Sequence, residues 1–241
     1  WSRNAFTMDE NLSKSVIKVF VELYNKGLIY KDKKLVNWDT VLKTAISDLE
    51  VDQREVNSKI YYIKYPIDGT SEFITIATTR PETMLGDTAI AVNPKDDRFK
   101  SFVGKTVTIP LVGRKIKIIE DDYADPEQGT GALKITPAHD FNDYDVGQRN
   151  DLEIINIFTE EGKINENAPA NYVGLDRFEA RKKILKELKE KEFFDKEENI
   201  KNKVPYGDRS NSIIEPFLTE QWFADAGKLS VKAKEVVNSK K

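Results

Sequence analysis

Residues 129–145, GTGALKITPAHDFNDYD, gather side chains that can do chemistry at what the pattern predicts to be the end of a strand. Lys134 and Thr136 alternate with apolar neighbours, which puts both on one strand face, and we expect that face to line solvent or a pocket. Asp140 and Asp143 stand three positions apart, so a helical turn would bring both carboxylates to one side, where they could hold a cation. The alternative is that these aspartates are a helix cap and a surface charge.

The stretch ATTRPETMLGDTA at 77–89 offers a second set of polar groups after a strand. Pro81 suits the first position of a helix, so the backbone N–H groups that follow it and the Thr83 hydroxyl are expected to face the space above the strand. Such a helix start favours anions and carbonyl oxygens. The alternative is that Thr79, Arg80 and Pro81 form an ordinary strand-to-helix turn.

The residue types offer little to metal chemistry. The chain has no cysteine and one histidine, His139, which we interpret as structural rather than as a general base. A calcium loop counted from Asp140 fails, because Tyr144 occupies the fifth position, where an oxygen ligand belongs. A magnesium site that uses Asp121 or Asp122 stays open, but it rests only on the presence of acids. We therefore predict no metal ligand.

Composition indicates a folded protein of the cytoplasm. The 241 residues are 39% hydrophobic and 33% charged, which suits one large domain or one domain with appendages. No apolar run reaches the roughly 18–20 residues of a membrane span, and the first residues lack the layout of a signal peptide, so we expect no membrane partner. The net charge of −3 argues against binding long nucleic acid by bulk charge alone, while a short, locally basic contact stays open.

Hydrophobic patterning predicts an α+β fold. Apolar residues at helical spacing predict a helix over 8–26 that stops at Gly27, and a second helix over 175–194. Between them lie seven short runs rich in β-branched and aromatic residues, which we predict as strands: KIYYIKYPI, EFITIATT, TAIAVNP, KTVTIP, GRKIKII, GALKIT and EIINIFT. Because no regular helix separates each pair, they favour a closed or nearly closed mixed β-barrel with peripheral helices.

The two polar stretches, taken together, closely resemble the editing domain of valyl-tRNA synthetases. The resemblance is carried by TTRPETMLGDTAIAVNP and by GTGALKITPAHDFNDYDVG, in that order. The flanks WSRNAFTMDE, LVNWDTVLKTAISDLEV and VPYGDRSNSIIEPFLTEQW are similar to the segments through which that family's chain leaves and re-enters the catalytic body. Isoleucyl and leucyl enzymes share the fold, but the motifs are similar to the valyl branch. The resemblance implies an N-terminal helix and stalk over 1–58, the editing barrel over 59–200 and a return stalk over 201–241.

The resemblance also implies roles for individual residues. Asp140 resembles the carboxylate that receives the substrate's α-ammonium group, and Asp143 the one that reads the threonine hydroxyl. Arg80 and Lys134 are expected to contact substrate or terminal-phosphate oxygens. The remaining candidates are Thr83 and Thr136, which would position the attacking water. Of these site residues, we expect Thr83, Lys134 and Asp140 to be catalytic.

The family implication for the tRNA end rests on Arg80 and Gln128. Gln128 stands just before the Gly-Thr-Gly turn, where relatives carry an aromatic residue. If that aromatic stacks on the terminal adenosine, a contribution of about 1–3 kcal/mol is missing from this chain. The expected affinity for the tRNA end is correspondingly lower.

The implied activity is hydrolysis of threonine misattached to valine tRNA, by an oriented water and without a cofactor. The chain contains neither the His-Ile-Gly-His nor the Lys-Met-Ser-Lys-Ser motif of class I synthetases, so ATP-dependent activation belongs to a catalytic body elsewhere. The expected partners are the acceptor end of valine tRNA and the rest of the synthetase. Two alternatives stay open: a module that binds the acceptor end without turnover, and a hydrolase that uses a metal held by carboxylates.

Overall fold

The computed structural model describes residues 4–239, which divide into two compact units. The smaller unit contains the residues up to Lys34 and those from Thr219 onward, and the larger one spans Leu35–Leu218. The three-part division predicted from the sequence, with stalks on either side of a barrel, stays a prediction. Among residues 4–239, no helix is both long and apolar enough to cross a membrane.

The smaller unit is organised by its helices and aromatic side chains. The predicted first helix is confirmed as α1 (Glu10–Asn25), and Gly27, with φ of 66°, follows its end. A second helix, α4 (Ala226–Asn238), lies at the C-terminal end of the unit. The indole of Trp222 packs edge-on against Phe20 at 5.2 Å between ring centroids. No residue of α1 is buried, so Trp222 covers its apolar stripe only in part within this unit.

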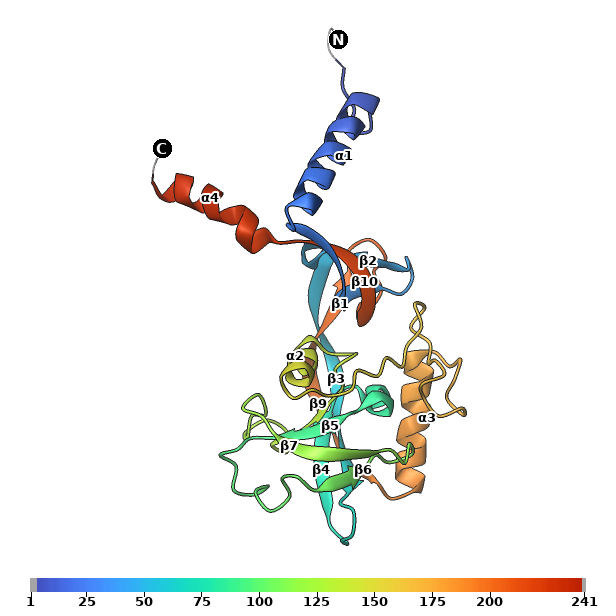
Figure 1. Ribbon diagram of the computed structural model, residues 1–241. Helices are drawn as coiled ribbons and strands as arrows, with labels where there is room; N and C mark the ends of the chain where they lie inside the picture. The colour runs from blue at the N-terminus through green and yellow to red at the C-terminus, as the bar shows by residue number, and fades with distance from the viewer. Residues whose placement is uncertain (1–3, 240–241) are drawn as a thin grey trace. The chain divides into compact units, whose positions relative to one another are not determined.

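Strands of the larger unit form sheets rather than a closed ladder. One sheet has the order β4-β3-β9, all antiparallel. A second has the order β6-β7-β5-β8, with β5 and β7 parallel. Figure 1 shows β9 running beside β3 along most of its length. The bounds are β3 (Val51–Pro66), β4 (Phe73–Thr78), β5 (Ala89–Val92), β6 (Thr106–Thr108), β7 (Lys115–Glu120), β8 (Ala132–Ile135) and β9 (Phe194–Gly207).

A third sheet has the order β10-β1-β2. It consists of β1 (Ile29–Asp39), β2 (Thr44–Ile46) and β10 (Glu215–Ala224), and a short 3₁₀ turn, η1 (Asp48–Glu50), leads from β2 into β3. Inside the larger unit, Trp38 packs on Phe217 and donates its indole N–H to the Glu160 carbonyl at 2.9 Å. Burial of this indole anchors β1 in the larger unit.

The main core lies between the sheet β4-β3-β9 and the sheet β6-β7-β5-β8. Alternation along β3 and β4 directs Ile63, Ile74 and Ile76 inward, where they are fully buried. The helix α3 (Arg177–Glu190) covers this core with Ile184 and Leu188, spaced four apart on one face. A smaller cluster under α2 (Phe141–Arg149) includes Ala89, Ile135 and Val146.

Two sequence predictions are revised by this arrangement. Within residues 4–239 the hydrogen-bonded strands do not close into a ring, so the mixed α and β composition is confirmed and the barrel is not. The run EIINIFT is not a strand: Phe158 makes only an isolated bridge to Ile164, because Ile157 and Phe158 enter the core from a loop. The segments 35–51 and 201–241 also contain strands that the sequence patterns did not predict, from β1, β2, β9 and β10.

Candidate functional site

A buried polar cluster forms where β8 ends beside the 3₁₀ helix η2 (Pro81–Gly86). The ammonium of Lys134 lies 3.3 Å from Asp87 Oδ1, and the Thr136 hydroxyl donates to the same oxygen at 2.6 Å. Lys134 also donates to the Thr136 hydroxyl. The other carboxylate oxygen accepts from the Tyr65 hydroxyl at 2.7 Å. Asp87 therefore binds both predicted site residues, Lys134 and Thr136.

The electrostatics of this cluster follow from its burial. Removal from water raises the pKa of Asp87, and the nearby Lys134 ammonium acts in the opposite direction. Burial and the Asp87 carboxylate together raise the pKa of Tyr65 well above its usual value, so its phenol stays a hydrogen-bond donor. Lys134 is thus a buried cation whose neutralising partner is Asp87. Sequence analysis missed this aspartate, although it stands in the quoted LGDTA run.

Asp140 and Asp143 are brought together at the start of α2, as their spacing predicts. Asp140 is the N-cap: its side chain accepts from the N–H groups of Asn142 at 2.8 Å and Asp143 at 3.1 Å. The alternative interpretation, a helix cap and a surface charge, is therefore confirmed for the cap. Asp143 is no surface charge, because it is only 6% exposed and its Oδ2 accepts from the Thr136 N–H at 2.9 Å.

The two carboxylates differ in their environment. Burial raises the pKa of Asp143 to about 7, with Lys134 opposing this rise and Asp140 adding to it. Asp140 remains exposed at the helix start. One carboxylate thus meets water while its neighbour is buried and titrates near neutral pH, which allows two chemically different roles within one turn.

Arg80 is committed to carboxylates in this structure. Its guanidinium pairs with Glu215 and lies 3.4 Å from Glu82 Oε1, and it donates to the His139 carbonyl at 3.1 Å. Burial lowers its pKa, but the two carboxylates outweigh this and hold the pKa above its usual value. Glu82 is in turn bound twice by Arg181 of α3, each N–O distance being 2.7 Å. Arg80 thereby ties η2 to the loop that carries Asp140.

Thr83 is buried in η2 and donates its hydroxyl to the Arg80 carbonyl at 3.0 Å. The predicted helix start with Pro81 in its first position is confirmed, but as a 3₁₀ helix. The hydroxyl is turned back onto its own backbone rather than into open space. Its oxygen keeps lone pairs that can still accept a hydrogen bond.

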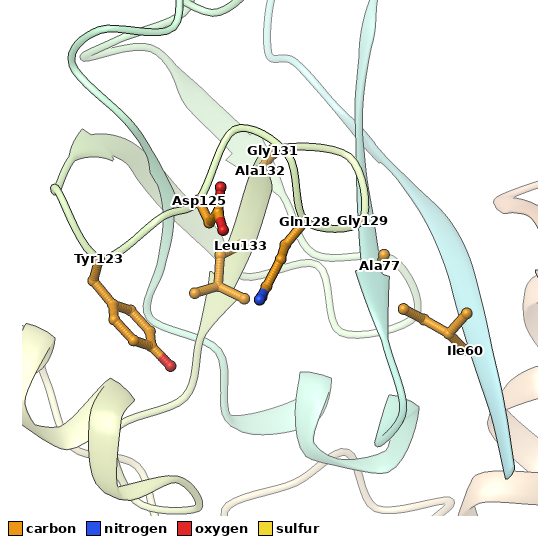
Figure 2. A pocket seen from close by; sticks show the side chains of 9 residues that line it. All are labelled: Ile60, Ala77, Tyr123, Asp125, Gln128, Gly129, Gly131, Ala132 and Leu133. Carbon is orange, nitrogen blue, oxygen red and sulfur yellow. The ribbon is translucent and has the colours of Figure 1, made fainter. Parts of the chain in front are cut away.

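A pocket of about 400 Å³ is lined in part by Ala132 and Leu133, which precede Lys134 on β8, and Figure 2 shows the side chains that surround it. In that view the Gln128 amide lies between Leu133 and Ala77. The turn that carries Gln128 depends on Gly129, whose φ is 59° and where a Cβ would meet Ala77 Cβ at 2.9 Å. The lining residues are Ile60, Ala77, Tyr123, Asp125, Gln128, Gly129, Gly131, Ala132 and Leu133.

The strand alternation at 131–137 is confirmed, but the polar side does not line this pocket. Leu133 lines it, while Lys134 and Thr136 face the buried cluster around Asp87. The polar face avoids solvent because a buried aspartate supplies the hydrogen bonds that solvent would otherwise provide. Tyr123 lines the pocket and is affected by the charges of the α2 aspartates. Burial makes the largest contribution to raising its pKa, and the charges of Asp140 and Asp143 raise it further.

His139 is a structural residue in this fold. Its Nε2 accepts from the Ile157 N–H at 3.0 Å, and its ring packs on Phe158 at 4.5 Å. Burial, with the charges of Arg80 and Lys134, lowers the pKa of His139 well below its usual value. The imidazole therefore stays neutral and uncharged at physiological pH, as its structural interpretation predicts.

The acids do not gather into a ligand set. Among residues 4–239 no group of three or more His, Cys, Asp or Glu side chains is arranged to hold a metal ion. Asp121, considered for magnesium, accepts two hydrogen bonds from Arg149 at 2.8 and 2.7 Å and another from Asn150 at 2.9 Å. Its oxygens are engaged by the end of α2, where they fix that helix.

The family is decided by a match over the entire length. The model of the family described as tRNA synthetases class I (I, L, M and V) matches residues 1–241. The chain belongs to these class I tRNA synthetases. The polar motifs around Arg80 and Asp140 are therefore those of a class I synthetase chain.

Within class I, the similar proteins are valine-tRNA ligases. The chain is 87% identical over 241 residues to that of Pelagibacter ubique (strain HTCC1062), covering 100% of this chain and 28% of the ligase. It is 52% identical to that of Caulobacter vibrioides, covering 99% of this chain and 29% of the ligase, and 53% identical to that of Thermotoga maritima, covering 99% and 28%. The resemblance to valyl-tRNA synthetases is confirmed, and the chain spans less than a third of the length of these relatives.

A solved class I structure also aligns with the chain. It is the ternary complex of Agrobacterium radiobacter K84 agnB2 LeuRS, tRNA and LeuAMS, at 18% identity and a TM-score of 0.47. The alignment covers 82% of this chain and 33% of that one.

Proposed function

We propose that this chain is the editing domain of a valyl-type synthetase and hydrolyses the ester that joins threonine to valine tRNA. The proposal is supported by family membership over residues 1–241 and by similarity to valine-tRNA ligases. The observation that carries it is the pair of unlike carboxylates at the start of α2, Asp140 exposed and Asp143 buried, whose charges reach Tyr123 in the lining of the pocket of about 400 Å³.

A second site is needed because valine and threonine have almost the same shape. A hydrophobic pocket rejects an added hydroxyl poorly. Valyl-tRNA synthetase, the standard example, discriminates against threonine only about a hundredfold at its synthetic site. A site built to bond the hydroxyl would leave its polar groups unpaired when valine enters. That penalty is about 1–3 kcal/mol for each buried group, which spares the correct product.

The two aspartates divide the recognition of the amino acid. Asp140, exposed at the N-cap of α2, receives the α-ammonium group. Asp143 reads the threonine hydroxyl through Oδ1, because Oδ2 is already engaged by the Thr136 N–H. Thr136 thus acts by orienting Asp143.

Lys134 and Thr83 act on the ester. The Lys134 ammonium has three N–H donors; Asp87 and Thr136 engage two, which leaves one for the oxygen that becomes negative during hydrolysis. The Thr83 oxygen, whose hydrogen is donated to the Arg80 carbonyl, accepts a hydrogen bond from the attacking water. Arg80 itself holds the loop that carries Asp140.

Hydrolysis needs no cofactor in this scheme. The oriented water adds to the carbonyl carbon, and the ester C–O bond then breaks. The proton lost by the water ends on the departing ribose oxygen, with help from the neighbouring ribose hydroxyl. Free threonine and intact tRNA result. The terminal adenosine occupies the pocket beside Gln128, whose amide can bond base edges but offers no aromatic face.

The proposal is tested by deacylation of threonyl-tRNA(Val) and, in parallel, of valyl-tRNA(Val), with the 241-residue chain in excess and a chelator present. We expect faster release of threonine and background release of valine. Equal release of both amino acids would contradict the selective site, and sensitivity to the chelator would favour a metal hydrolase. Binding of tRNA without release of either amino acid would favour the non-catalytic module.

A further inference from the structure

Glu215 is a buried carboxylate that lies outside both polar motifs of the sequence. It is the first residue of β10, in the segment that the resemblance assigns to the return of the chain toward the catalytic body. Only 3% of Glu215 is exposed, and it pairs with the guanidinium groups of Arg80 and Arg177. The Arg177 Nε lies 2.9 Å from Glu215 Oε1. Two arginines thus fix this carboxylate in place.

The pairs of Glu215 continue into a network of alternating charges. Arg80 lies between Glu215 and Glu82, and Arg181 donates to both carboxylate oxygens of Glu82. Three guanidinium groups therefore share two carboxylates. Without Glu215, Glu82 alone would serve Arg80 and Arg181, and Arg177 would lose the carboxylate with which it pairs. Neither carboxylate of the network is redundant.

Arg80 transmits the position of Glu215 to the loop that precedes α2. Its Nη2 donates to Glu215, and its Nη1 donates to the His139 carbonyl at 3.1 Å. This carbonyl belongs to the planar peptide bond that leads into Asp140, so its direction sets the direction of the Asp140 backbone. Arg80, Asp140 and Glu215 also line one cavity, of about 360 Å³, which shares no residue with the pocket beside Gln128.

The direction of Asp140 matters because its side chain has one oxygen to offer a ligand. Its Oδ1 accepts both cap bonds, from the N–H groups of Asn142 and Asp143, so we assign the substrate's α-ammonium group to Oδ2. A charge-assisted hydrogen bond weakens when its distance and angle depart from their preferred values. A misplacement of about 1 Å in a site of this kind can cost about a hundredfold in rate.

We propose that Glu215 is a positioning residue of the editing site: it fixes Arg80, which holds the peptide bond before Asp140 and so directs Asp140 toward the α-ammonium group. The inference rests on the proposed function, which assigns that group to Asp140. It also explains why an arginine is needed at position 80. The planar fork of arginine reaches Glu215 and the His139 carbonyl together, whereas the single nitrogen of a lysine is a point charge.

The test measures binding, by isothermal titration calorimetry, of a threonyl-adenosine analogue in which a stable amide replaces the ester. The companion ligand carries 3-hydroxybutanoyl in place of threonyl and so lacks only the α-amino group. We expect the unmodified chain to prefer the threonyl analogue, and Glu215→Gln to reduce this preference about tenfold. Partial unfolding would lower the number of binding sites and leave the ratio of the two affinities unchanged.

Two further variants make the test specific. Arg80→Lys keeps the charge and loses the fork, so it should cause the same loss of preference, and combining it with Glu215→Gln should cause no additional loss. Glu187→Gln is the matched control, because Glu187 is half-buried on α3, accepts from the Tyr172 hydroxyl at 2.7 Å and lines neither cavity. We expect this control to keep the full preference. Circular dichroism checks that each variant is folded.

Deacylation of threonyl-tRNA(Val) by the unmodified chain separates this inference from the proposed function. An active chain whose Glu215→Gln and Arg80→Lys variants keep the preference would overturn the positioning role and leave the editing function standing. An inactive chain whose variants lose the preference would overturn hydrolysis and support the positioning role. Equal binding of the two ligands by the unmodified chain, or an equal loss of preference in Glu187→Gln, would also overturn the positioning role.

Discussion

The ionisation of Asp143 makes the editing reaction depend on pH. Its pKa of about 7 means that the ionised fraction rises from about 9% at pH 6 to about 91% at pH 8. If the carboxylate must accept the threonine hydroxyl, the deacylation rate rises about tenfold over this interval. The assay is release of threonine from threonyl-tRNA(Val), corrected at each pH for hydrolysis without the protein.

The variant Asp143→Asn isolates this effect, because its amide does not titrate. We expect a low rate that no longer follows pH after correction. Asp145→Asn serves as control, since Asp145 is exposed on the same helix α2 and lines neither cavity. A flat profile in the unmodified chain, or an unchanged profile in Asp143→Asn, would refute the assigned role.

The same raised pKa affects stability in a defined direction. The folded state keeps the Asp143 proton up to about pH 7, whereas an unfolded aspartate loses it near 3.9, so stability falls as pH rises through this window. The folded and unfolded pKa values differ by about three units, which corresponds to about 4 kcal/mol in the free energy of unfolding. Urea midpoints should therefore decline more from pH 5 to pH 8 in the unmodified chain than in Asp143→Asn, and parallel declines would contradict the shift.

Three further predictions follow from other contacts. Asp87→Ala leaves Lys134 buried without its counter-charge and should cost about 3–5 kcal/mol in urea unfolding; a loss below about 1 kcal/mol would show that Lys134 finds water instead. Gln128→Phe supplies a stacking face and should tighten binding of the trinucleotide cytidylyl-cytidylyl-adenosine about tenfold by fluorescence anisotropy, unless the base lies elsewhere. His139 is held neutral, so stability should fall by about 1.4 kcal/mol per pH unit below 6.5, and His139→Gln should lack that part of the slope in urea titrations.

Sequence patterns were sufficient where one face of an element is buried and the other is wet. The stripe of Ile184 and Leu188 predicts α3, and the alternation of Ile74 and Ile76 predicts β4. The strand β9 escaped prediction because its sequence, FDKEENIKNKVPYG, is polar along most of its length. Its order comes from the ladder with β3, a partner that lies far away in the sequence. No local pattern encodes such a pairing.

The candidate site shows the same division. The spacing of Asp140 and Asp143 predicts their placement at one helix start, because both lie within a single turn. The burial of Asp143 depends on contact with the Thr136 backbone, and the neutralisation of Lys134 depends on Asp87, 47 positions away. Likewise, Arg181 reaches Glu82 across 99 positions. Tertiary contacts of this kind decide which charges are buried, so their pKa values cannot be derived from spacing.

The most direct test of the central claim is the rate of threonine release from threonyl-tRNA(Val) by the unmodified chain and by Asp143→Ala, with trinucleotide binding measured on the same preparations. Our account predicts that the variant binds the RNA as the unmodified chain does and loses nearly all threonine release. Release at the unmodified rate by a folded Asp143→Ala variant would contradict the assignment of the hydrolytic site to this pair of aspartates.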